Sequence, residues 1–250
     1  VAVTAWMWRT TPGSLVPDED QGFYIAAVIL PDGATLQRTD KVVAEVLQII
    51  KSNPANEDAV AFTGFDFLGG GYVLTMAERN VVAASKQGDL VVFRFRDGSL
   101  TVEQSLHMPA EITAMSTARI DPNKLNEQVF VALKGGEVRM YDSVEGILTQ
   151  VGTSQAAGNV ATLAFDEVDG DGIRDAVVVA GGALQVLPGF EMLDRIHTPD
   201  TSASALDTIP TDYEVAAAIT GHFLFDRNPT ESIAALGVDG ALHDASFFMG

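Results

Sequence analysis

The residues most able to do chemistry lie in one short acidic stretch, residues 165–175, where carboxylates alternate with glycines. A glycine-rich backbone of this kind can fold around a hard cation so that alternate side chains and one carbonyl point inward. Carboxylates that converged without a cation would repel one another. The spacing therefore predicts one Ca²⁺ site, and the alternative is a solvated acidic turn, because Asp-Gly turns are common without metal. The expected ligands are the side chains of Glu167, Asp169, Asp171 and Asp175 and the carbonyl of Ile173.

The acidic stretch and the apolar run Ala176–Val179 after it resemble the calcium loops of FG-GAP/VCBS propellers. That family more often has Asp where Glu167 stands, a difference expected to change the affinity for calcium. Ile120–Lys124 and Phe225–Pro229 resemble degenerate copies with too few carboxylates, so one ion is expected. Its role would be structural, since all the expected ligands are protein groups and no base or nucleophile lies nearby.

Four segments after residue 71 share one pattern, in which an apolar run, a glycine turn and a second apolar run follow one another. This pattern predicts antiparallel hairpins. The apolar runs are 81–84 and 90–93, 129–132 and 138–141, 176–180 and 184–187, and 233–236 and 241–242.

The turn glycines of these hairpins are Gly88, Gly136, Gly182 and Gly240, which are 48, 46 and 58 residues apart. A propeller blade has a period of roughly 40 to 50 residues. The spacing favours a mainly β fold with a partial or small β-propeller of about four blades. The alternative is an irregular antiparallel sandwich, whose strands are equally short and bounded by turns.

The first part of the chain has a different pattern. An apolar run at Phe23–Leu30 predicts a strand, and apolar residues at helical spacing over 36–51 predict a helix with Thr35 as N-cap and Asn53-Pro54 as terminator. A second strand is expected at Asp58–Thr63, followed by the glycine-rich loop 64–70. This strand-helix-strand unit has an apolar face and too few elements of its own to bury it.

Residues 12–22 (PGSLVPDEDQG), 30–35 (LPDGAT) and Arg38-Thr39 closely resemble the start of the second periplasmic loop of resistance-nodulation-division (RND) multidrug efflux pumps. The resemblance covers about residues 1 to 70. It implies that Val1–Arg9, which is apolar and carries two tryptophans, is the end of a transmembrane helix. From the residues alone, this stretch could equally be a buried N-terminal segment.

The RND family uses a loop rich in glycine and phenylalanine to separate two drug pockets, and residues 64–70 match that loop in position and type. The resemblance implies that Phe65 and Phe67 contact an apolar small-molecule substrate, with Val60 and Phe62 on the strand leading to the pocket. Aromatic rings on a glycine-hinged segment offer apolar contact without demanding one substrate shape. The alternative is that these aromatic side chains fill a core.

Composition excludes several classes of function. The net charge of −19 disfavours nucleic acid as a partner, which needs clustered Lys and Arg. The chain has no cysteine, so thiolate metal sites and cysteine nucleophiles are excluded. No phosphate loop, zinc-protease helix or nucleophile elbow is present, and the four histidines lack ligand spacing, so no enzyme is expected.

The sequence therefore predicts two parts: an RND porter-subdomain fragment with the end of a transmembrane helix over 1–70, and FG-GAP-like propeller repeats over 72–250. One hypothesis is a transporter fragment fused to a calcium-binding module and unable to transport alone. The other is a calcium-stabilised module that binds a protein or another ligand. Both place the chain in a bacterial cell envelope, periplasmic or extracellular, and contact with a membrane would come through upstream segments.

Overall fold

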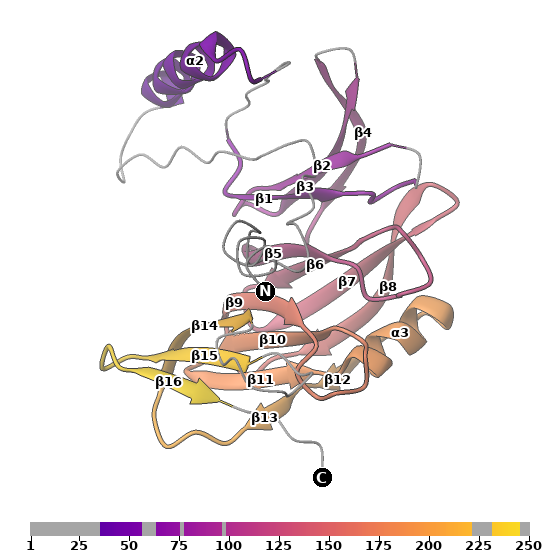
Figure 1. Ribbon diagram of the computed structural model, residues 1–250. Helices are drawn as coiled ribbons and strands as arrows, with labels where there is room; N and C mark the ends of the chain where they lie inside the picture. The colour runs from indigo at the N-terminus through magenta and orange to yellow at the C-terminus, as the bar shows by residue number, and fades with distance from the viewer. Residues whose placement is uncertain (1–35, 57–63, 76–77, 97–98, 222–231, 246–250) are drawn as a thin grey trace, which may run out of the picture. The chain divides into compact units, whose positions relative to one another are not determined.

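Most of the described chain is β-structure. The computed structural model describes residues 36–56, 64–75, 78–96, 99–221 and 232–245. The chain divides at Ala34/Thr35, and every described residue belongs to the unit Thr35–Gly250. Within the described residues this unit contains two helices and sixteen strands (Figure 1). The prediction of a mainly β fold is confirmed.

Helix α2, Leu36–Ser52, confirms the helix expected from the apolar spacing. Its apolar positions 42, 43, 46, 47 and 50 are half-buried and its charged positions are exposed. The helix ends where the N–H of Asn53 donates to the carbonyl of Ile50, and Pro54 follows. No described helix is long and apolar enough to span a bilayer. The predicted cap Thr35 and the predicted strands Phe23–Leu30 and Asp58–Thr63 lie outside the described residues.

Four antiparallel sheets follow α2 along the chain, and each is built mainly from consecutive strands. The first contains β1 (Phe67–Gly71), β2 (Asn80–Ala84), β3 (Asp89–Arg96) and β4 (Ser99–His107). The second contains β5 (Ile112–Ala118), β6 (Gln128–Leu133), β7 (Glu137–Val144) and β8 (Ile147–Gln155). The third contains β9 (Val160–Asp166), β10 (Asp175–Ala180), β11 (Ala183–Leu187) and β13 (Asp207–Ile209). The fourth contains β14 (Val215–Gly221), β15 (Ser232–Gly237) and β16 (Leu242–Ala245).

All four predicted hairpins are present. They are the pairs β2/β3, β6/β7, β10/β11 and β15/β16. The turn glycines Gly88, Gly136, Gly182 and Gly240 have φ between +79° and +105°, a conformation that side chains with a Cβ rarely adopt. At Gly136 a Cβ would also lie 2.6 Å from the carbonyl oxygen of Ala156. Both the backbone conformation and the lack of space therefore favour glycine at this turn.

Successive sheets pack face to face through three clusters of buried apolar side chains. The central strands supply both of their faces to these clusters. In β6, Val129 and Val131 pack toward the first sheet and Phe130 toward the third, since side chains alternate along a strand. The first strands of successive sheets also lie beside one another: β1 by β5, β5 by β9, and β9 by β14.

The glycine-rich segment differs from its prediction. Phe67–Gly71 forms strand β1, paired in register with β2, so the loop expected over residues 64–70 was wrong in its second half. The apolar run of β2 needs a partner on each edge, and the backbone of 67–71 supplies one. The first sheet thus takes its first strand from residues up to the expected boundary at residue 71 and its other three strands from residues after that boundary.

Two elements interrupt the series of hairpins. Helix α3, Gly189–His197, packs Met192 and Ile196 into the core between the second and third sheets. Strand β12, Asp200–Ala205, then pairs in parallel with β8 and makes the second sheet five-stranded. The chain therefore returns to the second sheet before β13 completes the third.

Candidate metal centre

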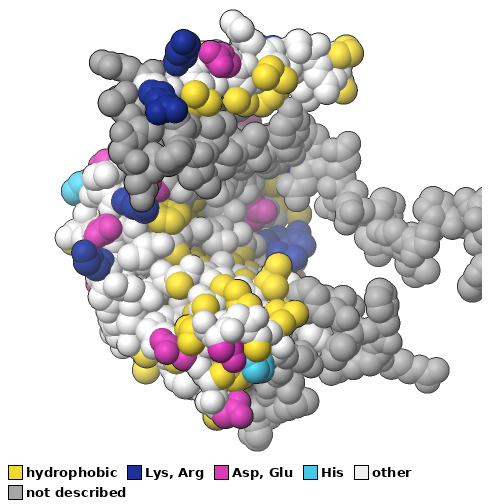
Figure 2. Space-filling view, turned by 90° about the vertical axis from the view of Figure 1, so that its left-hand side faces the viewer, with side chains coloured by type: hydrophobic (Ala, Val, Ile, Leu, Met, Phe, Trp, Pro, Cys, Tyr) yellow, Lys and Arg dark blue, Asp and Glu magenta, His cyan; other side chains and the backbone are white. Residues whose placement is uncertain are grey.

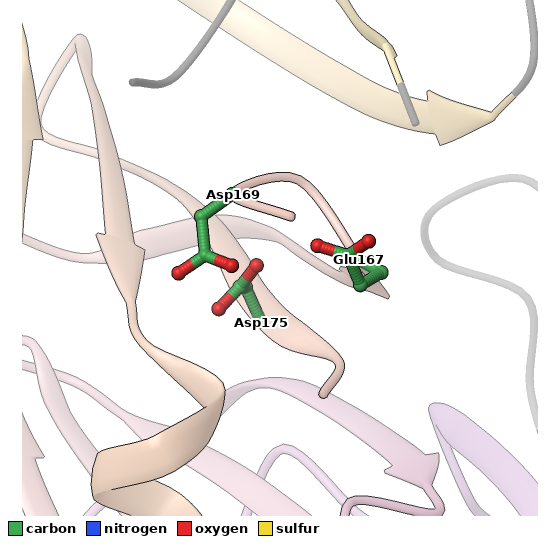
Figure 3. A group of neighbouring side chains, drawn as sticks. All are labelled: Glu167, Asp169 and Asp175. Carbon is green, nitrogen blue, oxygen red and sulfur yellow. The ribbon is translucent and has the colours of Figure 1, made fainter. Parts of the chain in front are cut away.

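The acidic stretch forms the loop between β9 and β10, which pair antiparallel so that Asp166 lies opposite Asp175. Oxygens of Glu167, Asp169 and Asp175 all lie within 4.8 Å of one another. Figure 3 shows Asp169 and Asp175 close together, with Glu167 on the adjoining part of the loop. The structure thus brings together three of the four predicted carboxylates from one connection between adjacent strands.

Hydrogen bonds from backbone N–H groups to side chains shape this loop. Oδ1 of Asp169 accepts from the N–H of Asp171 at 3.0 Å, and Oδ1 of Asp171 accepts from that of Ile173 at 2.7 Å. Oε1 of Glu167 accepts from the N–H of Gly170. Such local bonds are the usual reason that Asp is favoured in tight turns. Each of these bonds joins residues two or three apart and so fixes a tight turn of the backbone. Oδ2 of Asp169 accepts none of them.

Asp175 is the anchor of the loop. Its side chain is fully buried, and its two oxygens accept from the N–H of Val168 at 3.0 Å and of Gly189 at 2.7 Å. Burial raises the pKa of Asp175 to about 6, because a charged carboxylate loses hydration there. The two N–H donors lower this pKa and the nearby carboxylates of Asp169 and Asp171 raise it.

The two other predicted ligands lie differently. Asp171 is exposed and is not one of the three clustered carboxylates. Its pKa is nevertheless raised, by partial loss of hydration and by the neighbouring carboxylate of Asp169. Ile173 is half-buried and packs its side chain against the core between the second and third sheets. The sequence pattern therefore identified the loop and its three clustered oxygens, with Asp171 at the rim.

These residues fit a hard divalent cation. All the clustered donors are carboxylate oxygens, the ligand type that calcium prefers. Oδ2 of Asp169 is shielded from solvent and has no hydrogen-bond partner. Within the described part of the chain, no Lys or Arg forms an ion pair with Glu167, Asp169 or Asp175. A cation at this position would offset the mutual repulsion of three carboxylates that form no ion pair with the described Lys and Arg residues.

The matching loop of the second sheet, between β5 and β6, was expected to be a degenerate copy. Here Asp142, which the sequence pattern did not single out, is buried and accepts from Asn126 at 2.7 Å, from Gln128 at 2.9 Å and from Lys124 at 3.4 Å. Asp121 is also buried and accepts from Nε2 of His197 at 3.1 Å when that nitrogen carries a proton. Protein donors therefore surround both Asp121, which belongs to this loop, and Asp142, which belongs to strand β7 and lies against the loop.

The residues predicted to contact an apolar substrate are partly described. Val60 and Phe62 lie outside the described residues. Phe65 is half-buried and meets the ring of Phe93 edge to face, with centroids 5.9 Å apart. Phe67, in β1, packs against the core between the first and second sheets. Both phenylalanines therefore have apolar contacts within the first sheet.

Comparison with known proteins gives two separate similarities. The model of the AcrB/AcrD/AcrF family matches residues 1–82, a third of the chain, and so reaches into β2. The toluene efflux pump membrane transporter TtgB of Pseudomonas putida is 30% identical over an alignment of 106 residues that covers 37% of this chain and 10% of TtgB. The multidrug export protein AcrF of Escherichia coli is 42% identical over 71 residues, 28% of this chain and 7% of AcrF. The N-terminal part is thus similar to RND efflux transporters, and the chain spans about a tenth or less of their length.

The second similarity concerns the fold. A crystal structure of BBS1N in complex with ARL6DN superposes with a TM-score of 0.51 at 16% identity, covering 75% of this chain and 52% of BBS1N. At this identity the match describes the arrangement of the strands.

Proposed function

We propose that the chain joins an RND-type porter segment to a calcium-stabilised, propeller-like module with a binding role. The observation that carries the module's part of this proposal is the carboxylate cluster of Glu167, Asp169 and Asp175, in which Oδ2 of Asp169 is shielded from solvent and has no hydrogen-bond partner. A binding role is favoured over catalysis because the side chains of the loop, apart from Arg174, are carboxylates and apolar groups, and they include no histidine, serine or lysine that could act as a base or nucleophile. In this proposal the module acts in the cell envelope, where millimolar calcium suits weak extracellular-type sites.

The arrangement of the sheets supports blades of a propeller. Each of the four sheets is built mainly from consecutive antiparallel strands, and the first strands of neighbouring sheets lie side by side. A propeller places its blades in this way, with first strands innermost and blades packed face to face. The acidic loop joins the first and second strands of its sheet, so an ion would fix the end of an inner strand.

Glu167, Asp169 and Asp175 would hold the ion, and the rim residue Asp171 would complete the set directly or through water. The ion would supply positive charge and oxygen coordination, and the chain would supply a preformed turn. Asp175 already uses both oxygens for backbone N–H groups, so it would orient the loop as well as contribute negative charge.

The porter segment supports a second role, contact with an apolar small molecule. Residues 1–82 are similar to transporters whose names state toluene or multidrug export. In this proposal Phe65 and Phe67, with Val60 and Phe62, would form the apolar contact, while proton-coupled transport would require the remainder of such a protein. Quenching of Phe65→Trp fluorescence by an apolar dye would test the contact, and unchanged emission would contradict it.

A thermal melt of the whole chain with and without calcium tests the metal centre. An ion at 100 times its dissociation constant stabilises the folded state by about 2.7 kcal/mol. We expect calcium to raise the melting temperature by about 5 to 10 °C, and Asp169→Asn to abolish this rise.

Asp239→Asn is the matched control for this melt. Oδ1 of Asp239 accepts from the N–H of Ala241 at 2.9 Å, a turn bond like that made by Asp169. The control variant should keep the full calcium response. A wild-type chain that melts at the same temperature with and without calcium would contradict the metal centre and leave the porter similarity untouched.

A further inference from the structure

The fourth sheet has one buried face and one exposed apolar face. Ala218, Ile233 and Ala235 point into the core shared with the third sheet. The opposite side chains form what we call the outer face. They are Ala217, Ile219, Ala234, Leu236 and Leu242, brought together by the register of β14, β15 and β16.

The outer face is open to solvent. Ile219 is 59% exposed, Leu236 is 39% exposed and Leu242 is 74% exposed. Strands β6 and β10 show the contrasting arrangement, since every residue of both is buried. Contiguous exposed apolar patches on folded proteins mark interaction sites more often than isolated apolar side chains do.

The described strands and turns of this sheet carry acidic side chains and no Lys or Arg; Arg227, in the connection between β14 and β15, lies outside the described residues. Residues 199–221 and 232–245 contain no Lys or Arg. Asp212, Glu214 and Asp239 of these segments are exposed. Figure 2 shows hydrophobic side chains gathered on the side where β14–β16 lie, with acidic side chains among and below them. The surface combines an apolar centre with an acidic rim.

We propose that the outer face docks a protein partner whose apolar side chains are flanked by Lys and Arg. Apolar contact would supply affinity, and the basic flanks would pair with the acidic rim and steer association. A second copy of the chain fits poorly, because each copy carries a net charge of −19. An anionic membrane surface is repelled by the same acidic rim.

The test uses the full chain and a synthetic peptide of alternating Leu and Lys, about ten residues long to match a long strand. Affinity is measured by fluorescence anisotropy, and the contact is located by hydrogen–deuterium exchange. We expect slower exchange over 215–221 and 232–245 on binding. The double variant Ile219→Ser, Leu242→Ser should bind at least about tenfold more weakly.

The double variant Val102→Ser, Ile147→Ser is the matched control, because these side chains are 61% and 58% exposed on other sheets. It should bind like the wild type. Equal loss in both double variants, equal binding of a Leu-Glu peptide, or binding to anionic vesicles would overturn the proposal. A wild-type dimer in sedimentation that Ile219→Ser, Leu242→Ser dissociates would assign the face to a second copy and overturn it as well.

Discussion

The second and third sheets stabilise the carboxylates at the connection between their first two strands in different ways. At the β5–β6 loop, the side chains of Lys124, Asn126 and Gln128 donate to the buried carboxylate of Asp142, which belongs to β7. At the β9–β10 loop, three carboxylates gather without an ion pair to any described Lys or Arg, and one oxygen of Asp169 has no partner among the described residues.

The difference shows two ways in which the same connection can accommodate buried carboxylates. A buried carboxylate needs compensating donors or a cation. The second sheet supplies donors from its own side chains and from His197 of α3, so its closure should be independent of calcium. The third sheet has a cluster of carboxylates in this connection, so its closure should depend on an ion or on protons. Three experiments sharpen or break this comparison.

The largest expected effect comes from removing the carboxylate of the second sheet. Asp142→Ala leaves Asn126, Gln128 and Lys124 without their shared acceptor, and should lower the free energy of unfolding by about 3 kcal/mol. Urea unfolding measures this loss, which should be the same with and without calcium. Glu111→Ala removes an exposed ion pair with Lys134 and should cost less than about 1 kcal/mol. A small or calcium-dependent loss in Asp142→Ala would remove the distinction between the two loops.

The next effect is a pH dependence that belongs to the third sheet. The pKa of Asp175 rises from 3.8 to about 6 in the folded state, so the folded chain holds this proton more tightly than the unfolded chain. Its contribution to stability is complete below pH of about 4 and is lost as the pH rises toward about 6, a loss of about 2 to 3 kcal/mol without calcium. Calcium should offset this loss by binding the ionised form.

Urea unfolding of the wild type and of Asp175→Asn across this pH range isolates the effect. Asp89, Asp121 and Asp200 have lowered pKa values and so contribute with the opposite sign, but they are present in both proteins and cancel in the difference. A difference that does not change with pH would show that Asp175 is ionised throughout, and would contradict the burial argument.

The smallest effect concerns the histidine that supports the second loop. Burial alone raises the pKa of Asp121, and the Asn123 N–H and His197 outweigh that effect and lower it. His197 is more than half exposed, so His197→Gln should cost about 0.5 to 1 kcal/mol near neutral pH. The calcium response in the melt should be unchanged, and a reduced response would show that the two loops are coupled through α3.

The local patterns of the sequence were sufficient where each residue's environment is set by its neighbours. The apolar runs around Gly88, Gly136, Gly182 and Gly240 predicted four hairpins because a turn glycine and two apolar strands are local features. The spacing from Glu167 to Asp175 predicted a carboxylate cluster for the same reason. The helix at residues 36–52 followed from its 3.6-residue period.

Long-range features were beyond the sequence patterns. The sequence gives no signal that Asp142 would meet Asn126 and Gln128, because the register of β6 and β7 brings them together. Strand β12 is rich in Ser and Ala and lacks the alternation of a half-buried strand, so its pairing with β8 is set by the path of α3. Gly69 and Gly70 suggested a loop by composition, whereas pairing with β2 makes them a strand.

The return of the chain to the second sheet also sets the order in which the molecule can be completed during synthesis. The outer edge of β8 stays unpaired until residues as far as Ala205 have left the ribosome, and the third sheet waits for Ile209. The second and third sheets are thus completed one directly after the other, by the neighbouring strands β12 and β13. A chain stalled near residue 190 would expose two strand edges at once, a state prone to aggregation.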